Sequence, residues 1–341
     1  MKSTALVDAG TFEVESRERP QPEASEVLVD VSDVGICGSD LHWYDHGRMD
    51  DRIVEDPLVL GHESAGRVIE VGRDVDRVAV GDEVAIEPGV PCGRCQYCRS
   101  GRYNLCQDVA FMATPGTDGA FREYVAWPAD FVYRLPSSIS TREGALCEPI
   151  SVGIQAVRRA EIDVGDTVLV MGAGPIGTLA MDVAKAAGAA NLVVVDIVPS
   201  KLDRAAERGA TLTIDARETD VAKAVRDEFG AGVDVAIEAT GASPAIEVTL
   251  DAPRPDGTVV LIGLAPDETV PMDTFELVRR QIDVRGSYRF ANTYPTAISL
   301  LTAGEVDATG IMDFEMSFDR IGDAFERAKE PDVIKGMISM D

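Results

Sequence analysis

The chain has 341 residues, of which 59 are acidic and 32 basic, so its formal net charge is −27. This excess excludes binding to nucleic acid or to an anionic membrane through a general surface charge, because both polyanions would repel the protein. The length exceeds what one hydrophobic core of usual size supports, so two domains are expected. No apolar run is long enough to predict a membrane-spanning helix.

The negative charge is spread along the whole chain, and only six of the basic residues are lysine. Such a surface is typical of a protein in a high-salt cytoplasm, where close screening removes the self-repulsion. The first twenty residues lack the apolar stretch and cleavage pattern of a signal peptide, so we expect a cytoplasmic, halophilic protein.

Residues 1 to about 150 are rich in glycine, proline and short β-type runs. Examples are "EVLVDVSDVGICG" at 26–38 and "GRVIEVG" at 66–72. This texture predicts an irregular, mostly β domain.

Two segments of this domain carry candidate metal ligands. Cys37 lies in "GICGSDLHWYDHGRM", and "GHESAG" at 61–66 supplies His62 followed by Glu63. A thiolate and an imidazole with a carboxylate and one open position form the typical donor set of a catalytic zinc. The chain has only three histidines, all between positions 42 and 62, which makes this grouping more specific.

Four of the six cysteines are crowded into "CGRCQYCRSGRYNLC", residues 92–106. Their spacing is C-x2-C-x2-C-x7-C, and in a cytosolic chain disulfides are disfavoured. Four thiolates suit a closed, tetrahedral structural zinc at Cys92, Cys95, Cys98 and Cys106. An iron–sulfur cluster would accept the same ligands. A nucleic-acid-binding zinc module is disfavoured by the net charge.

From about residue 151 the pattern changes to alternating strands and helices, which predicts a parallel sheet with helices on both faces. The expected strands are 166–172, 192–196, 233–239, 258–263 and 282–287, and the expected helices are 175–189 and 200–210. Two further helices are expected at 294–307 and near 323–330.

The motif "GAGPIG" directly follows the first of these strands and opens a helix. In a G-x-G-x-x-G sequence the first glycine allows a tight turn, the second lets a pyrophosphate approach, and the third lets helix and strand pack closely. The free N–H groups of the helix N-terminus complete an anion site. We expect the cofactor to be bound by Gly172, Gly174, Pro175, Ile176 and Gly177.

Asp196 ends the next strand and selects the cofactor. Its carboxylate can accept hydrogen bonds from the adenosine ribose hydroxyls and would repel a 2′-phosphate, which favours NAD. Lys201 and Arg204 follow closely, so NADP stays open at this point, and Lys201 is a further candidate for cofactor binding.

In this order, Cys37, "GHESAG", the four-cysteine segment, "LCEPISVG" (146–153) and "GAGPIG" resemble the zinc-dependent medium-chain dehydrogenases over nearly the whole chain. The segments "VGICGSDLHWYDHGR", "FMATPGTDGAFREYV" and "GSYRFANTYPTAISLL" are most similar to the sorbitol and xylitol dehydrogenases. The resemblance implies a GroES-like catalytic domain (1–150 and 287–341, zinc lobe at about 90–107). A Rossmann NAD-binding domain (151–286) would be inserted in it, with the active site in the cleft between them.

The resemblance also implies roles for single residues. Cys37, His62 and Glu63 would hold the catalytic zinc, and Glu148 would bind its water or the metal itself. Cys147, beside Glu148, is interpreted as a buried core thiol. Ser39 and His42 would relay the proton to solvent, the other route being the zinc water and Glu148. The substrate pocket implied by the family is lined by Trp43, Phe111, Thr114 and Arg289.

The implied reaction oxidises a polyol's secondary alcohol to a ketose, with a zinc-stabilised alkoxide and hydride transfer to NAD. The implied enzyme is a homotetramer or dimer with two zinc ions per subunit. Dehydrogenases of the same superfamily that act on a simple alcohol, threonine or an aldose remain an alternative, because pocket residues change specificity readily. A non-catalytic binding protein is disfavoured, since the metal and nucleotide motifs are both intact.

Overall fold

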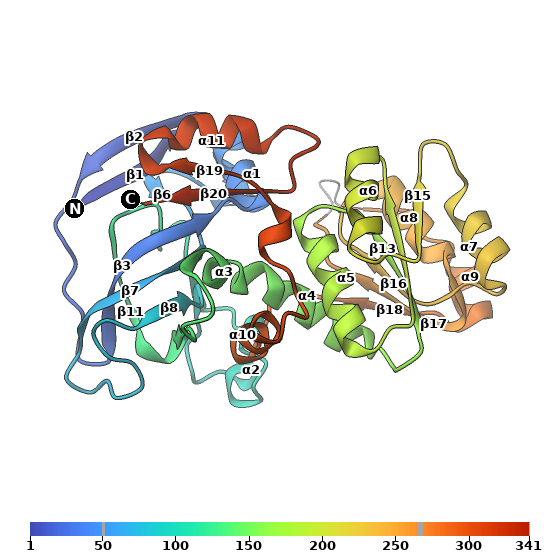
Figure 1. Cartoon of the computed structure of the whole chain (residues 1–341), viewed down its shortest axis with the longest axis horizontal. Helices are drawn as coiled ribbons and strands as arrows, with labels where there is room; N and C mark the ends of the chain where they lie inside the picture. Colours follow the sequence, from blue (N-terminus) through green and yellow to red (C-terminus); the bar gives the residue numbers. More distant parts are fainter. Residues whose placement is uncertain (50–51, 265–268, 341) are drawn as a thin grey trace. The chain divides into compact units, whose positions relative to one another are not determined.

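The computed structural model describes residues 1–49, 52–264 and 269–340. The chain divides into two compact units. Unit 1 comprises Met1–Glu148, Tyr294–Thr302 and Ala308–Asp341, and unit 2 comprises Pro149–Thr293 and Ala303–Asp307. Residues 149–150, 287–293 and 303–307, which the family resemblance implied for the catalytic domain, group with unit 2 in this division. Both ends of the chain lie in unit 1 (Figure 1).

The main sheet of unit 1 has seven strands among the residues that the structure describes. Six of them follow the order β12-β8-β7-β3-β20-β19, and the seventh, β11, pairs with β3. Strand β3 is central in this sheet, since it pairs with β7, β11 and β20, and most of its residues are buried. The strands are β3 (Glu26–Gly35), β7 (Glu63–Val71), β8 (Glu83–Ile86), β11 (Tyr124–Pro128), β12 (Val132–Arg134), β19 (Met312–Ser317) and β20 (Lys335–Ser339).

Smaller strand groups and short helices complete unit 1. The predicted final helix is α11, and it packs on β19 and β20. The remaining strands are β1 (Lys2–Asp8), β2 (Thr11–Ser16), β4 (Arg48–Met49), β5 (Arg52–Ile53), β6 (Leu58–Val59), β9 (Gly89–Val90) and β10 (Ala110–Phe111). The helices are α1 (Gly38–His46), α2 (Gln96–Arg99), α3 (Thr141–Ala145), α10 (Tyr294–Ala303) and α11 (Ile321–Ala328), and α4 (Cys147–Ala160) begins here and continues into unit 2.

Unit 2 contains a parallel sheet in the order β15-β14-β13-β16-β17-β18, which confirms the predicted doubly wound α/β arrangement. Helices α5 and α6 pack on β13–β15, and α8 and α9 pack on β16–β17 (Figure 1). The strands are β13 (Thr167–Met171), β14 (Asn191–Asp196), β15 (Leu212–Asp215), β16 (Val233–Glu238), β17 (Pro253–Leu261) and β18 (Asp283–Gly286). The helices are α5 (Pro175–Ala187), α6 (Pro199–Glu207), α7 (Val221–Phe229), α8 (Ser243–Asp251) and α9 (Thr274–Arg280).

Each unit has its own hydrophobic core, formed by the inward-facing residues of its sheet. In unit 2 the central strand β13 is buried along its whole length, as expected for a parallel strand covered on both faces. Across the part of the chain that the structure describes, no helix is both long and apolar enough to cross a membrane.

Candidate functional site

Three candidate zinc ligands meet at one end of the unit 1 sheet. Cys37 immediately precedes α1, and His62 and Glu63 stand where β7 begins. One ligand atom from each lies within 4.8 Å of the others. Glu63 is fully buried and His62 is nearly so, while Cys37 is half-buried. The sulfur, nitrogen and oxygen donors of this group fit a zinc ion that keeps a position for a further ligand.

Asp40, which the sequence interpretation missed, organises these ligands. Its fully buried carboxylate accepts hydrogen bonds from the backbone N–H groups of Cys37 and Gly61, each at 3.1 Å. Its Oδ1 also lies 3.4 Å from Nδ1 of His62. Burial lowers the pKa of His62, but Asp40 and Cys37 outweigh it and raise that pKa well above its usual value. With Nδ1 facing Asp40, Nε2 is left for a metal. The Cys–x–x–Asp spacing of a helix N-cap could have indicated Asp40.

Glu148 lies near the start of α4 and is 5% exposed. It does not belong to the group of three whose ligand atoms lie within 4.8 Å. Burial raises the pKa of Glu148 to about 7; His62 opposes the shift and Glu63 adds to it. The electrostatic interactions with His62 and Glu63 agree with the prediction of an outer or exchangeable ligand.

Cys147, directly before Glu148, has a fully buried side chain outside both metal groups. Burial raises the pKa of its thiol well above the usual value, which agrees with a buried core thiol.

The two candidate relay residues lie on α1. Ser39 is half-buried, and His42 is exposed with its ring centroid 4.7 Å from that of His46. Both residues lie on the helix that begins directly after Cys37, and their role as a proton relay stays a prediction.

The four candidate substrate residues have different environments. The ring of Phe111 lies 5.7 Å from that of His62, and the hydroxyl of Thr114 donates to the Phe111 carbonyl at 2.7 Å. Trp43, by contrast, is 2% exposed and packs in the core of unit 1. Arg289 belongs to unit 2, where it lies over the Tyr288 ring and has a positive φ of 50°.

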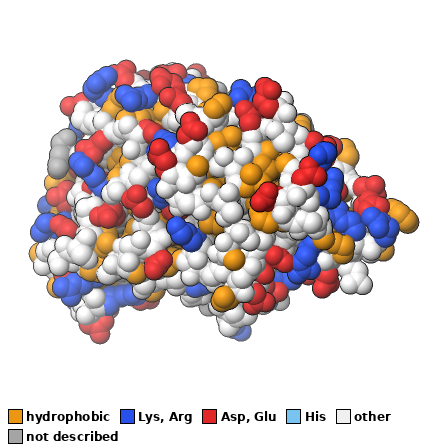
Figure 2. Space-filling view, turned by 45° about the vertical axis from the view of Figure 1, so that its right-hand side comes forward, with side chains coloured by type: hydrophobic (Ala, Val, Ile, Leu, Met, Phe, Trp, Pro, Cys, Tyr) orange, Lys and Arg blue, Asp and Glu red, His pale blue; other side chains and the backbone are white. Residues whose placement is uncertain are grey.

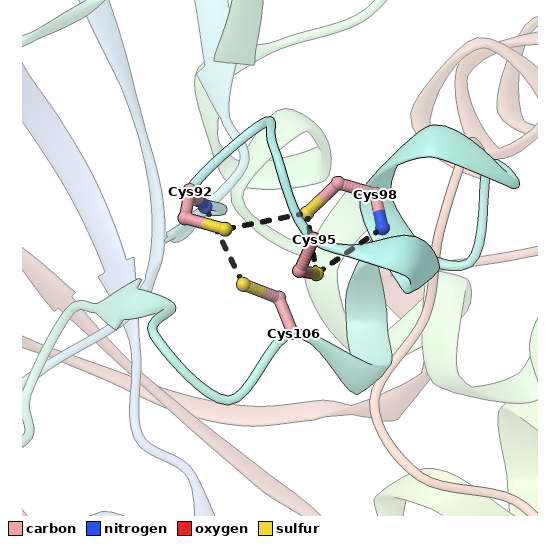
Figure 3. Close-up of side chains that lie close together, drawn as sticks. All are labelled: Cys92, Cys95, Cys98 and Cys106. Atoms are coloured by element: carbon pink, nitrogen blue, oxygen red, sulfur yellow. Dashed lines mark hydrogen bonds between the residues drawn. The ribbon is translucent and has the colours of Figure 1, made fainter.

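The other four cysteines form a separate lobe in unit 1, and their thiols turn towards one another (Figure 3). The Sγ atoms of Cys95 and Cys98 are 3.4 Å apart, and those of Cys92 and Cys98 are 4.0 Å apart. Hydrogen bonds from the backbone N–H groups of Arg94 and Cys95 lower the pKa of Cys92 to about 6, which favours a thiolate. All six cysteines of the chain are free thiols. Four converging sulfurs fit a closed structural zinc.

The "GAGPIG" segment joins β13 to α5 in unit 2. Gly172 has a φ of +100°, and a Cβ on Gly177 would lie 1.8 Å from the Gly172 carbonyl oxygen, so both positions require glycine. Gly174 is the N-cap of α5, and Pro175 is its first residue. Ile176 follows in the first turn, whose free N–H groups can receive a phosphate.

The Asp196 side chain is held at the end of β14. Its Oδ2 accepts a hydrogen bond of 2.6 Å from the N–H of Ala173, inside the glycine motif. Its Oδ1 accepts from the N–H groups of Ile197 and Val198 at 2.7 and 2.9 Å. The carboxylate is therefore fixed next to the turn. Lys201 follows Asp196 closely in the sequence and lies on α6, where it is half-buried.

Comparison with known proteins relates both units to one family. Residues 23–137 match the alcohol dehydrogenase GroES-like domain, and residues 175–303 match the zinc-binding dehydrogenase model. Sorbitol dehydrogenase from Bacillus subtilis is 43% identical over 96% of this chain and 93% of its own length. D-xylulose reductase A from Aspergillus niger is 40% identical over 99% and 97%.

Comparison with solved structures indicates the same family. The crystal structure of 2R,3R-butanediol dehydrogenase from Bacillus subtilis is 30% identical, covers 100% of this chain and 99% of its own, and superposes with a TM-score of 0.92. These matches confirm the predicted combination of a GroES-like domain with a Rossmann-type domain. The chain therefore belongs to the zinc-binding, medium-chain alcohol dehydrogenase family.

Proposed function

We propose that the chain oxidises a secondary alcohol of a polyol of the sorbitol or xylitol type to a ketose, with NAD as hydride acceptor. The main support is the 40–43% identity to sorbitol dehydrogenase and D-xylulose reductase over nearly the whole chain. The thiol, imidazole and carboxylate donors of unit 1 and the glycine turn of unit 2 supply the metal and nucleotide sites that this reaction needs.

Cys37, His62 and Glu63 would hold the catalytic zinc, with Glu148 as an outer or exchangeable ligand. When bound, the ion supplies a Lewis acid for the substrate hydroxyl. Asp40 orients the imidazole of His62. Ser39 and His42 take the hydroxyl proton and pass it to solvent, consistent with the exposure of His42. Phe111, Thr114, Arg289 and Trp43 are the proposed substrate contacts.

In unit 2, Gly172, Gly174, Pro175, Ile176 and Gly177 would receive the pyrophosphate of NAD, and Asp196 and Lys201 would bind the ribose hydroxyls. The second zinc would be held by Cys92, Cys95, Cys98 and Cys106. It would stabilise a lobe that has little apolar core of its own.

The test is NADH formation with xylitol, sorbitol, ribitol, arabitol, butanediol, threonine and glucose in about 2 M KCl. Each substrate is assayed before and after chelation of the metal. We expect chelator-sensitive turnover of at least one polyol. Turnover of only threonine, glucose or a simple alcohol would refute the polyol assignment and leave the family intact.

We further propose a halophilic, cytoplasmic protein. Even if every Lys and Arg paired with a carboxylate, 27 negative charges would remain. Acidic side chains are interspersed with basic ones on the visible face rather than gathered in one place (Figure 2). The free cysteines agree with a reducing compartment.

We expect the melting temperature to rise between about 0.1 and 3 M KCl, because a Debye length of about 3 Å at 1 M screens repulsion between neighbouring carboxylates. Differential scanning calorimetry in a KCl series measures this, and the same series in sucrose controls for general solute effects. A melting temperature that stays constant over this range would contradict the halophilic assignment.

We also propose a homo-oligomer, a tetramer or dimer. β18 is the edge strand of the unit 2 sheet, and the preceding helix α9 exposes Phe275 and Val278 to 72% and 77%. An open strand edge and exposed apolar side chains are both typical of surfaces that pair with a second copy.

A further inference from the structure

Lys335 is a fully buried lysine whose ammonium group makes all of its hydrogen bonds inside the protein. Its side chain is 1% exposed, and its Nζ lies 2.7 Å from both carboxylate oxygens of Glu63. A third hydrogen bond of 3.0 Å reaches the carbonyl oxygen of Ile36. The three N–H donors of an ammonium group are thus all occupied. A lysine held in this way is fixed in position and has no donor left for substrate.

The sheet order brings this lysine to the candidate zinc site. Strand β3 pairs with β7 on one side and with β20 on the other. Gly35, at the end of β3, lies opposite Glu63 of β7 and Met337 of β20. A Cβ on Gly35 would lie 2.1 Å from Oε2 of Glu63. The missing side chain at this position leaves the space that the Glu63 carboxylate occupies.

Both partners of Lys335 are linked directly to the metal donors. Glu63 is one of the three donors, and Ile36 immediately precedes Cys37. The backbone N–H of Ile36 also donates to the Gly336 carbonyl at 3.0 Å. Strand β20 therefore binds Ile36, next to Cys37, through both its N–H and its carbonyl group. Lys335 is therefore placed to set the position of a carboxylate and of the thiol's backbone together.

We propose that Lys335 is a positioning residue of the catalytic zinc site, holding Glu63 and the Ile36–Cys37 backbone in the arrangement that receives the metal. The inference rests on the proposed function only in taking Cys37, His62 and Glu63 as zinc donors. Residues that hydrogen-bond metal ligands commonly change metal affinity or activity by about 10- to 100-fold when replaced.

The test replaces Lys335 by methionine in the full-length protein and exchanges the catalytic zinc for Co²⁺, whose visible spectrum reports ligand geometry. We expect Lys335→Met to change the Co²⁺ spectrum and to lower kcat by about 10- to 100-fold. Lys329→Met is the matched control, because Lys329 pairs with Asp45 and Glu326 on the outside of the same unit. The control should retain both the wild-type spectrum and the wild-type kcat.

Two further variants keep the proposal testable if Lys335→Met folds poorly. Lys335→Met/Glu63→Gln removes both buried charges. Relative to Glu63→Gln alone, it should change the spectrum and kcat less than Lys335→Met changes them relative to wild type, because the part of the effect that passes through Glu63 is already lost. Gly35→Ala, whose methyl group would displace the carboxylate, should shift the Co²⁺ spectrum with Lys335 intact.

A lower melting temperature with an unchanged spectrum and kcat in Lys335→Met would overturn the proposal and leave a purely structural ion pair. A wild-type protein that binds Co²⁺ at Cys37 but oxidises no polyol would refute the proposed function instead. The spectroscopic comparison of the variants would still decide the role of Lys335.

Discussion

Cys37→Ser is expected to lower kcat by about 1000-fold or more and to remove one zinc ion per subunit. Zinc stabilises the developing charge on a substrate oxygen by several kcal/mol, and each 1.36 kcal/mol of barrier corresponds to about tenfold in rate. Serine keeps the size of the side chain but is a poor zinc ligand at neutral pH. Because Cys37 is half-buried at the start of α1, the substitution should leave the fold of unit 1 intact.

Metal content measured by atomic emission, together with steady-state kinetics, tests this expectation. Cys147→Ser is the matched control, because its thiol is fully buried outside both metal groups. The control should keep both zinc ions and most of the activity. If Cys147→Ser lost a zinc ion while Cys37→Ser kept both, the ligand assignment would be wrong.

Asp196→Ala is expected to raise the KM for NAD by about 10- to 100-fold and to raise the KM for NADP much less. A hydrogen bond to a charged group contributes about 1.5–3 kcal/mol, and each 1.4 kcal/mol corresponds to about tenfold in affinity. The variant also removes the negative charge that would repel a 2′-phosphate. The preference for NAD over NADP should therefore shrink by about the same factor.

The measurement is the KM for each cofactor at a saturating polyol concentration and constant KCl. Asp196→Asn is a useful comparison, since its amide oxygen can still accept from the Ala173 N–H that the carboxylate binds now. If both cofactors lost affinity equally in the alanine variant, Asp196 would act by holding the glycine turn rather than by selecting NAD.

Local features of the sequence were sufficient to predict the parts of this protein that depend on neighbouring residues. The alternation of apolar strands and amphipathic helices after residue 151 predicted the sheet of unit 2, because such periodicity is set by burial on one face or both. The spacing of Cys92, Cys95, Cys98 and Cys106 predicted a group that the structure brings together. Within a short loop, a small separation along the sequence already limits the distance between two side chains.

Other predictions joined residues from separate segments of the chain, and the family resemblance supported them. Cys37 and His62 are 25 positions apart, and composition alone does not bring them together. Trp43 was likewise proposed for the substrate pocket from the resemblance, and the structure adds that its side chain is 2% exposed and packs in the hydrophobic core of unit 1. Whether an aromatic residue on a short helix faces a core or a pocket depends on which strands cover that helix.

The sequence by itself determined two structural classes of unit, the four-cysteine group and a glycine-rich turn, because each follows from residue types at short range. Only the tertiary structure decided what surrounds the candidate zinc ligands. Lys335 is 272 positions from Glu63, and it reaches the carboxylate because the C-terminal strand β20 pairs with β3. Strand order is set by the packing of the complete chain, and no local pattern around Lys335 carries that information.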